Sequence, residues 1–202
     1  IASPDVHVDH EARQFRMYYH GILEDRRQVT RVAVSEDGVH FTASEPILGN
    51  SYWRAFEHGG WHYGLAMPGQ LYRSHDPLGP FEEGPRLFTP DMRHSAVMLE
   101  GDTLTVFYTD VGGEAPERVL VTTIDLAPDW REWRTGPGAE VLRPERDYEG
   151  ADLPLVPSIR GEITERARQI RDPGIFREDG RLYLLYACAG ESGIGLAELL
   201  QE

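Results

Sequence analysis

Acidic, histidine and arginine side chains recur at the ends of strand-like segments along this chain of 202 residues. A carboxyl group can donate or accept a proton near neutral pH once its surroundings shift its pKa. Imidazole and guanidinium groups can orient such carboxyls or bind oxygen-rich ligands. These groups perform chemistry together only if the fold brings them together. The candidates are Asp5, His20, Arg54, His94, Asp110, Arg171, Asp172 and Glu191.

The segments that would position these residues share one pattern, an aromatic-rich strand that follows a tight turn. Their starts lie 46, 43 and 78 residues apart. Turn residues such as Gly59-Gly60 and Asp179-Gly180 precede them and favour hairpins. Further strands flank each segment, so the repeating unit has about four strands in 43 to 46 residues. The segments are 15–21, 61–67, 104–110 and 182–188.

A four-stranded unit of this length is typical of the blades of a β-propeller. A β-sandwich, which also has short strands at regular spacing, is the alternative. The repeat of turns and aromatic residues at blade length favours the propeller. The sequence therefore predicts an all-β, single-domain propeller over residues 1–202. Its blades are expected at about 3–50, 52–90, 92–143 and 170–200, with a loop insertion over 144–169 that covers the site.

Propeller geometry would bring the candidate residues to one mouth of the central channel. The innermost strand of each blade starts at that mouth, and the second strand returns and ends there. Asp5, Arg54, His94 and the pair Arg171-Asp172 are expected at starts of innermost strands. The residues expected at ends of second strands are His20, Asp110 and Glu191.

Such a ring fits the cleavage of a glycosidic bond. One protonated carboxyl group donates to the leaving oxygen, and a second carboxylate activates water or attacks the anomeric carbon. Crowding in a partly desolvated funnel pushes the pKa values of carboxyl groups apart. Asp5 and Asp172 are the first choices because both are expected to open an innermost strand. Glu191 is the expected acid, with Asp110 or Glu149 as substitutes.

Each candidate also has a structural interpretation. Asp5 and Asp172 can cap turns or pair with arginines, and Glu191 can be an exposed loop residue without a catalytic role. His94 can bind sugar hydroxyls, orient a carboxylate, hold a metal or form part of the core. Trp53, at the start of a blade, is expected to stack on a sugar ring. The predicted substrate-binding residues are Arg54, Trp53, His94, Arg171, Asp110 and His20.

The stretches 3–7, 16–19 and 35–41 resemble a blade of the five-bladed propellers of glycoside hydrolase family 43 and its relatives, families 32, 62, 68 and 130. Residues 171–176, followed by 179–186, are similar to the repeat with which many of these proteins open a blade. The resemblance implies a five-bladed propeller with about one blade missing at the N-terminus of this chain. It also implies that aspartates at strand starts act as base, nucleophile or stabiliser.

The sequence departs from the family pattern, which places three acids on separate inner strands. The second and third visible blades begin with Arg54 and His94 in place of carboxylates. Either one acid comes from the missing blade, or the site has another chemistry, or it only binds. A Ca²⁺ ion in the channel is implied by the resemblance alone, and neither its ligands nor any other metal or cofactor can be predicted from the sequence.

The expected function is therefore hydrolysis of a plant or microbial oligosaccharide or polysaccharide. One alternative is a non-catalytic carbohydrate-binding propeller. Another is an enzyme of the glycoside phosphorylase type, in which an anion is bound by Arg54, Arg93, His94 and Arg171.

The composition excludes several other functions. The net charge is −14 and all 20 basic residues are arginine, so nucleic acid is an unfavourable partner, and Schiff-base or P-loop lysine chemistry is excluded. No apolar run is long enough to predict a membrane span. The single cysteine, Cys188, cannot form an internal disulfide, and with no visible signal peptide it favours the cytoplasm. Carbohydrate is the expected partner, and the sequence does not define an oligomeric state.

Overall fold

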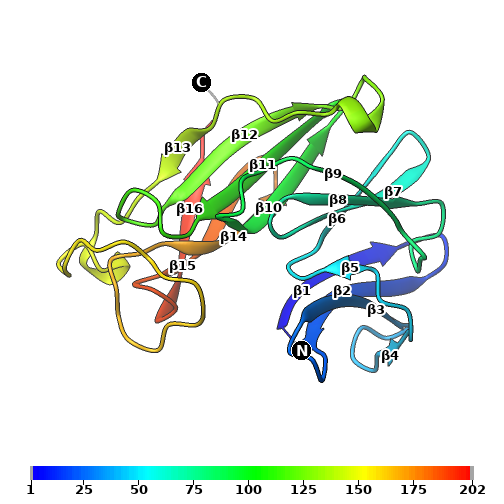
Figure 1. Cartoon of the computed structure of the whole chain (residues 1–202), viewed down its shortest axis with the longest axis horizontal. Helices are drawn as coiled ribbons and strands as arrows, with labels where there is room; N and C mark the ends of the chain where they lie inside the picture. Colours follow the sequence, from blue (N-terminus) through cyan, green and yellow to red (C-terminus); the bar gives the residue numbers. More distant parts are fainter. Residues whose placement is uncertain (1, 201–202) are drawn as a thin grey trace. The chain divides into compact units, whose positions relative to one another are not determined.

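The computed structural model describes residues 2–200, and nearly all of their regular structure is strand (Figure 1). This confirms the all-β prediction. Two short 3-10 turns, η1 (Trp130–Glu132) and η2 (Asp147–Glu149), lie in the connections. Within residues 2–200 no helix has the length and apolar character needed to cross a membrane.

The described strands form four antiparallel sheets, taken in chain order, in which consecutive strands pair, except that the two short last strands of the first sheet both pair with its third strand. This order is the topology of propeller blades. The first sheet contains β1 (Ala2–Asp9), β2 (Gln14–Ile22), β3 (Gln28–Ser35), β4 (Thr42–Ala43) and β5 (Gly49–Asn50). The second contains β6 (Arg54–His58), β7 (Trp61–Ala66), β8 (Gln70–Ser74) and β9 (Glu82–Arg86). The third contains β10 (Met92–Glu100), β11 (Thr103–Asp110), β12 (Val119–Asp125) and β13 (Ala139–Leu142), and the fourth contains β14 (Arg171–Glu178), β15 (Arg181–Cys188) and β16 (Gly193–Leu199).

The chain divides into two compact units. Unit 1 holds the first two sheets, up to Leu87, together with Asp129–Glu132. Unit 2 holds the third and fourth sheets, in Phe88–Pro128 and from Trp133 onward.

Each sheet has a residue with left-handed backbone within two residues of the start of its first strand. Ser3, Tyr52, His94 and Asp172 have φ angles of 47°, 57°, 47° and 48°. Non-glycine residues rarely adopt this region, and those that do cluster at functional sites. In β1, β10 and β14 the pairing register also shifts at this point, as in a β-bulge that re-aims a side chain. The shifts lie between Ala2 and Asp5, between Arg93 and Ala96, and between Arg171 and Gly174.

The core of unit 1 is built around Trp53, which is 1% exposed. Its ring stacks on Tyr18 and Tyr72, at centroid distances of 6.1 and 5.1 Å, and meets Phe81 edge-on at 5.0 Å. The sequence predicted that Trp53 would stack on a sugar. The structure corrects this expectation, because aromatic side chains of the core already surround the ring.

Gly64, on β7, makes room for the Trp53 ring. A Cβ atom at this position would lie 1.9 Å from the ring, so Gly64→Ala must displace the tryptophan. We expect the free energy of unfolding to fall by about 1–3 kcal/mol, the usual cost of overpacking a core. Urea unfolding followed by tryptophan fluorescence measures the loss. The matched control is Gly21→Ala on β2, where no atom lies within 4 Å of a new Cβ. Equal losses in the two variants would contradict the packing argument.

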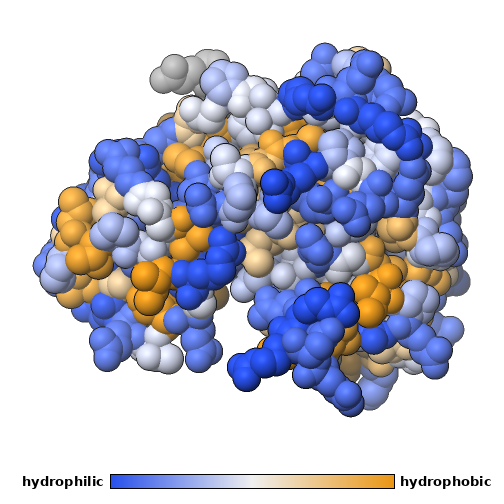
Figure 2. Space-filling view, in the orientation of Figure 1, coloured by the Kyte–Doolittle hydropathy of each residue, from blue (hydrophilic) through white to orange (hydrophobic). Residues whose placement is uncertain are grey.

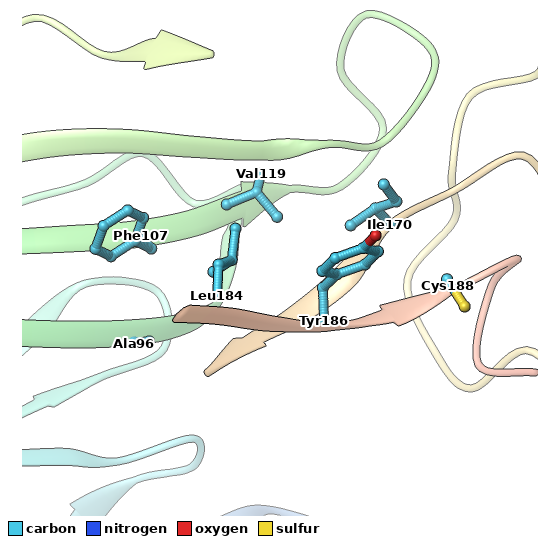
Figure 3. Close-up of a cluster of buried hydrophobic side chains, with 7 residues drawn as sticks. All are labelled: Ala96, Phe107, Val119, Ile170, Leu184, Tyr186 and Cys188. Carbon is cyan, nitrogen blue, oxygen red and sulfur yellow. The ribbon is translucent and has the colours of Figure 1, made fainter. Parts of the chain in front are cut away.

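In unit 2 a hydrophobic cluster joins the third and fourth sheets (Figure 3). It draws side chains from β10, β11, β12 and β15 and from the residue before β14, so it holds the first strands β10 and β14 beside each other. Its buried members are Ala96, Phe107, Val119, Ile170, Leu184, Tyr186 and Cys188.

Candidate functional site

Two of the predicted site residues meet where β10 and β14 begin. His94 Nδ1 lies 3.3 Å from Asp172 Oδ1. The His94 side chain is 6% exposed, whereas that of Asp172 is 41% exposed. A solvent-accessible carboxylate therefore lies next to a buried imidazole.

A buried glutamate, Glu117, links the residues that precede this pair. Its carboxylate accepts hydrogen bonds from Arg93 Nε at 2.9 Å and Arg93 Nη2 at 2.6 Å, and from Thr109 Oγ1 at 2.9 Å. Arg171 Nε lies 3.4 Å from the same carboxylate. All three charged side chains are almost fully buried. We call Arg93, Glu117 and Arg171 the arginine clamp, because one carboxylate holds the starts of both strands.

Arg171 and Glu191, predicted as substrate ligand and general acid, contact each other. Arg171 Nη1 donates to Glu191 Oε1 at 2.9 Å. The Nε and Nη2 groups of Arg171 both donate to Gln169 Oε1, at 3.1 and 2.5 Å. Protein acceptors thus engage the Arg171 guanidinium on several sides, and one oxygen of the predicted acid is already used as an acceptor.

Asp110, at the end of β11, has different surroundings. Burial raises the pKa of its carboxyl group, and the nearby negative charges of Asp91 and Glu117 raise it further. Its Oδ1 atom is buried and has no hydrogen-bond partner among the described residues. The side chain also borders a cavity of about 60 Å³ that Glu114 and Arg118 help to line. A carboxyl group that keeps its proton to higher pH is suited to general acid catalysis.

Glu149, the other substitute acid, has the opposite character. Burial would raise the pKa of this carboxyl, but hydrogen bonds lower it on balance. Tyr186 Oη donates to Glu149 Oε1 at 2.6 Å, and the backbone N–H groups of Glu145 and Arg146 donate to Oε2 at 2.8 and 2.9 Å. Glu149 thus anchors the loop that contains η2 and is poorly suited to donate a proton.

Asp5 lies in unit 1 and does not occupy the position equivalent to Asp172. Its Oδ2 atom accepts a hydrogen bond from the Ala55 backbone N–H at 2.7 Å and lies 2.9 Å from His7 Nε2. Asp5 therefore ties β1 to β6. The left-handed residue of β1 is Ser3. The dipeptides Ser3-Pro4 and Asp172-Pro173 were the sequence signal that would have aligned Ser3 with Asp172.

His20 and Arg54, the other predicted residues of unit 1, lie near the start of β6. His20 is buried, and its ring centroid is 4.6 Å from that of Tyr52. Burial lowers the pKa of His20, and the positive charge of Arg54 adds to this effect. Arg54 Nη1 donates to the Trp53 carbonyl at 2.9 Å.

The described residues do not bring three His, Cys, Asp or Glu side chains into a metal-binding arrangement. No residue of the chain is therefore assigned to the Ca²⁺ ion that the family resemblance implies.

Sequence comparison finds a longer relative of unestablished function. The uncharacterized protein R118 of Acanthamoeba polyphaga mimivirus is 36% identical over 218 residues, which cover 98% of this chain and 61% of the viral protein. The chain thus spans about three fifths of the length of this curated relative. No protein-family model matches the chain.

Solved structures share the fold at lower identity. A thermostable family-43 glycoside hydrolase matches with a TM-score of 0.67 at 16% identity, over 98% of this chain and 68% of its own. A β-1,2-mannobiose phosphorylase from Listeria innocua matches with a TM-score of 0.64 at 13% identity, over 98% and 71%. An α-L-arabinanase from Cellvibrio cellulosa, complexed with arabinohexaose, matches with a TM-score of 0.62 at 11% identity, over 98% and 73%.

These likenesses define the class of fold. The chain has the β-propeller fold of these solved structures, with four blades among the described residues. The prediction of a propeller is thereby confirmed.

Proposed function

We propose that the protein cleaves glycosidic bonds, with Asp172 as the base or nucleophile and Asp110 as the general acid. The observation that carries this proposal is the contrast between two carboxyl groups near the start of β10. Asp172 is accessible and lies beside His94, whereas burial raises the pKa of Asp110. Asp110 pairs across the sheet with Met92, two residues before His94. Glycosidases need one ionised carboxylate and one protonated carboxyl group. The surroundings of each group set its pKa and so its protonation state.

Asp110 replaces Glu191 as the preferred acid in this proposal. A general acid must present a proton to the leaving oxygen. Glu191 Oε1 accepts a hydrogen bond from Arg171 Nη1 at 2.9 Å, so this oxygen is already engaged with a guanidinium group. Asp110 has its Oδ1 atom buried without a partner and near two other acids, surroundings that favour the protonated form.

The proposed substrate is a plant or microbial oligosaccharide or polysaccharide. Support comes from structures of the same fold that were solved with such ligands, the arabinanase with arabinohexaose and a family-43 β-xylosidase/α-arabinofuranosidase with xylotriose. Arabinan and xylan oligosaccharides are therefore the first compounds to test.

Hydrolysis is preferred to phosphorolysis, although a phosphorylase shares the fold. A phosphorylase site needs cationic groups available to phosphate. Arg93 and Arg171, two of the predicted anion ligands, are buried and bound to Glu117, Gln169 and Glu191. This engagement supports water as the acceptor of the glycosyl group.

We also propose that the whole protein has five blades. The fourth sheet has three strands where the others have at least four, which leaves β16 at its edge. Apolar side chains of this sheet, Phe176, Ile194 and Leu196, are exposed, while hydrophilic residues dominate the face of the molecule in Figure 2. A further blade would cover such apolar side chains. The greater length of the mimiviral relative supports additional chain, and its expected place on the N-terminal side stays a prediction.

The Asp110→Asn variant tests the proposed acid. We expect the rate on arabinan or xylan oligosaccharides to fall about 10²–10⁴-fold, the usual contribution of a general acid. Dinitrophenyl glycosides, whose leaving group needs no proton, should be cleaved at close to the wild-type rate. In the wild type, activity should decline as pH rises through the pKa of Asp110, because the acid is then ionised. This alkaline limb should be absent in Asp110→Asn.

Asp91→Asn is the matched control. It removes an exposed negative charge that raises the pKa of Asp110, so the alkaline limb should move to lower pH while the maximal rate is kept. Assays of the wild type with and without inorganic phosphate separate the classes of activity. Phosphate-dependent turnover would identify a phosphorylase, and oligosaccharide binding without cleavage would identify a binding protein. Either result overturns the proposal of a hydrolase.

A further inference from the structure

We propose that His94 is a positioning residue, which holds the Asp172 carboxylate in one orientation so that its accessible side faces the substrate. This inference rests on the proposed function, because orientation matters only if Asp172 reacts. The contact that carries it is the 3.3 Å separation between His94 Nδ1 and Asp172 Oδ1.

The backbone at both residues is arranged for this contact. His94 and Asp172 have φ angles of 47° and 48°, a region that L-residues with side chains seldom occupy. Each stands where the pairing of its strand shifts register. Such a shift turns a side chain away from the regular ladder. Two neighbouring first strands therefore make the same unusual turn, and the two turned side chains meet.

The arginine clamp fixes the two turns relative to each other. His94 directly follows Arg93 and Asp172 directly follows Arg171, and both guanidinium groups face the Glu117 carboxylate. Because these three side chains are nearly fully buried, they have little freedom to move. The geometry of the His94–Asp172 pair is thus set by a buried framework and not by flexible surface side chains.

The charged groups on the elements packed against the pair have partners of their own. Arg93 on β10 is paired with Glu117, from the loop after β11. Arg171 on β14 is paired with Glu117 and with Glu191, from the loop between β15 and β16. Asp110, at the end of β11, is a further acid in this region, and burial raises the pKa of its carboxyl group. The imidazole of His94 faces the carboxylate, with Nδ1 3.3 Å from Oδ1, and this contact limits the orientations that the Asp172 side chain can take.

Two substitutions at His94 distinguish the effect of the imidazole from the effect of the backbone conformation. Both asparagine and glycine tolerate a positive φ, so neither should disturb the turn. His94→Asn keeps an N–H donor close to the position of Nδ1, whereas His94→Gly removes it. We expect kcat to fall about 10²-fold in His94→Gly with little change in KM, because a small misplacement of a reacting group has an effect of this size. His94→Asn should recover most of the loss.

The control is His40→Asn, at an exposed histidine in the loop between β3 and β4, whose Nδ1 lies 2.7 Å from Asp37 Oδ2. It removes a similar His–Asp contact outside the site and should leave kcat unchanged. Wild-type kcat in His94→Gly, or equal losses in His94→Gly and His94→Asn, would overturn the positioning role.

Nitrogen-15 NMR of the histidine rings tests the contact without any substrate. The His94 signals are assigned from their loss in His94→Asn. We expect the proton on Nδ1 in the wild type and a shift of both ring signals in Asp172→Asn. Unchanged His94 signals in Asp172→Asn would overturn the inference even if glycosides are cleaved. If the signals shift but the protein cleaves no glycoside, the contact between His94 and Asp172 is supported and the proposed function is refuted.

Discussion

Asp172→Asn is expected to reduce turnover of the glycoside substrate about 10³-fold or more, as removal of a catalytic group commonly does. The amide can neither accept a proton from water nor attack the anomeric carbon. Asparagine has nearly the same shape as aspartate and tolerates the φ of 48° at this position, so the fold should persist. The measurement is kcat/KM, with circular dichroism and urea unfolding to verify the native state.

Asp179→Asn provides a control with matching backbone. Asp179 lies in the turn between β14 and β15, has a φ of 49° and is exposed. Asp179→Asn makes the same chemical change at a residue with a similar φ on the same hairpin, and it should leave turnover unchanged. Full activity in Asp172→Asn would remove Asp172 from the mechanism, and equal losses in both variants would point to damage to the hairpin.

Local patterns in the sequence were enough to predict the strands and their turns. Gly59-Gly60 and Asp179-Gly180 have positive φ angles at all four residues, as the turn chemistry required. The aromatic-rich segments that follow tight turns identified β2, β7, β11 and β15, because aromatic residues favour strands and the turn residues mark where each strand begins. These features depend on neighbours along the chain, and a sequence contains that information.

The site depended on features that no local pattern records. The register shift in β1 leaves Asp5 two residues beyond the left-handed position, so it bonds Ala55 where the sequence suggested an equivalent of Asp172. Glu117 comes from a loop without strand periodicity, and its importance appears only when Arg93 and Arg171 converge on it. The raised pKa of Asp110 likewise reflects burial and spatial neighbours.

Glu117→Gln is expected to lower the free energy of unfolding by about 3–5 kcal/mol, because it leaves the buried Arg93 guanidinium without its anion. Glu117 is fully buried, and Arg93 and Arg171 lie 2.6 and 3.4 Å from its carboxylate. Urea unfolding measures the loss. Glu114→Gln is the control in the same loop, since Glu114 is 84% exposed in its ion pair with Arg118. It should change stability by less than about 1 kcal/mol.

A double variant can distinguish stability from positioning. Arg93→Met with Glu117→Leu removes one buried charge of each sign and leaves Arg171 paired with Glu191. Apolar replacement of a buried ion pair is often neutral for stability, so unfolding should return toward the wild-type value. Turnover should nevertheless stay low, because the arginine clamp then no longer links the start of β10 to Arg171 and fixes His94 beside Asp172. Wild-type turnover in this variant would show that the hydrophobic cluster between the two sheets positions the pair without the arginine clamp.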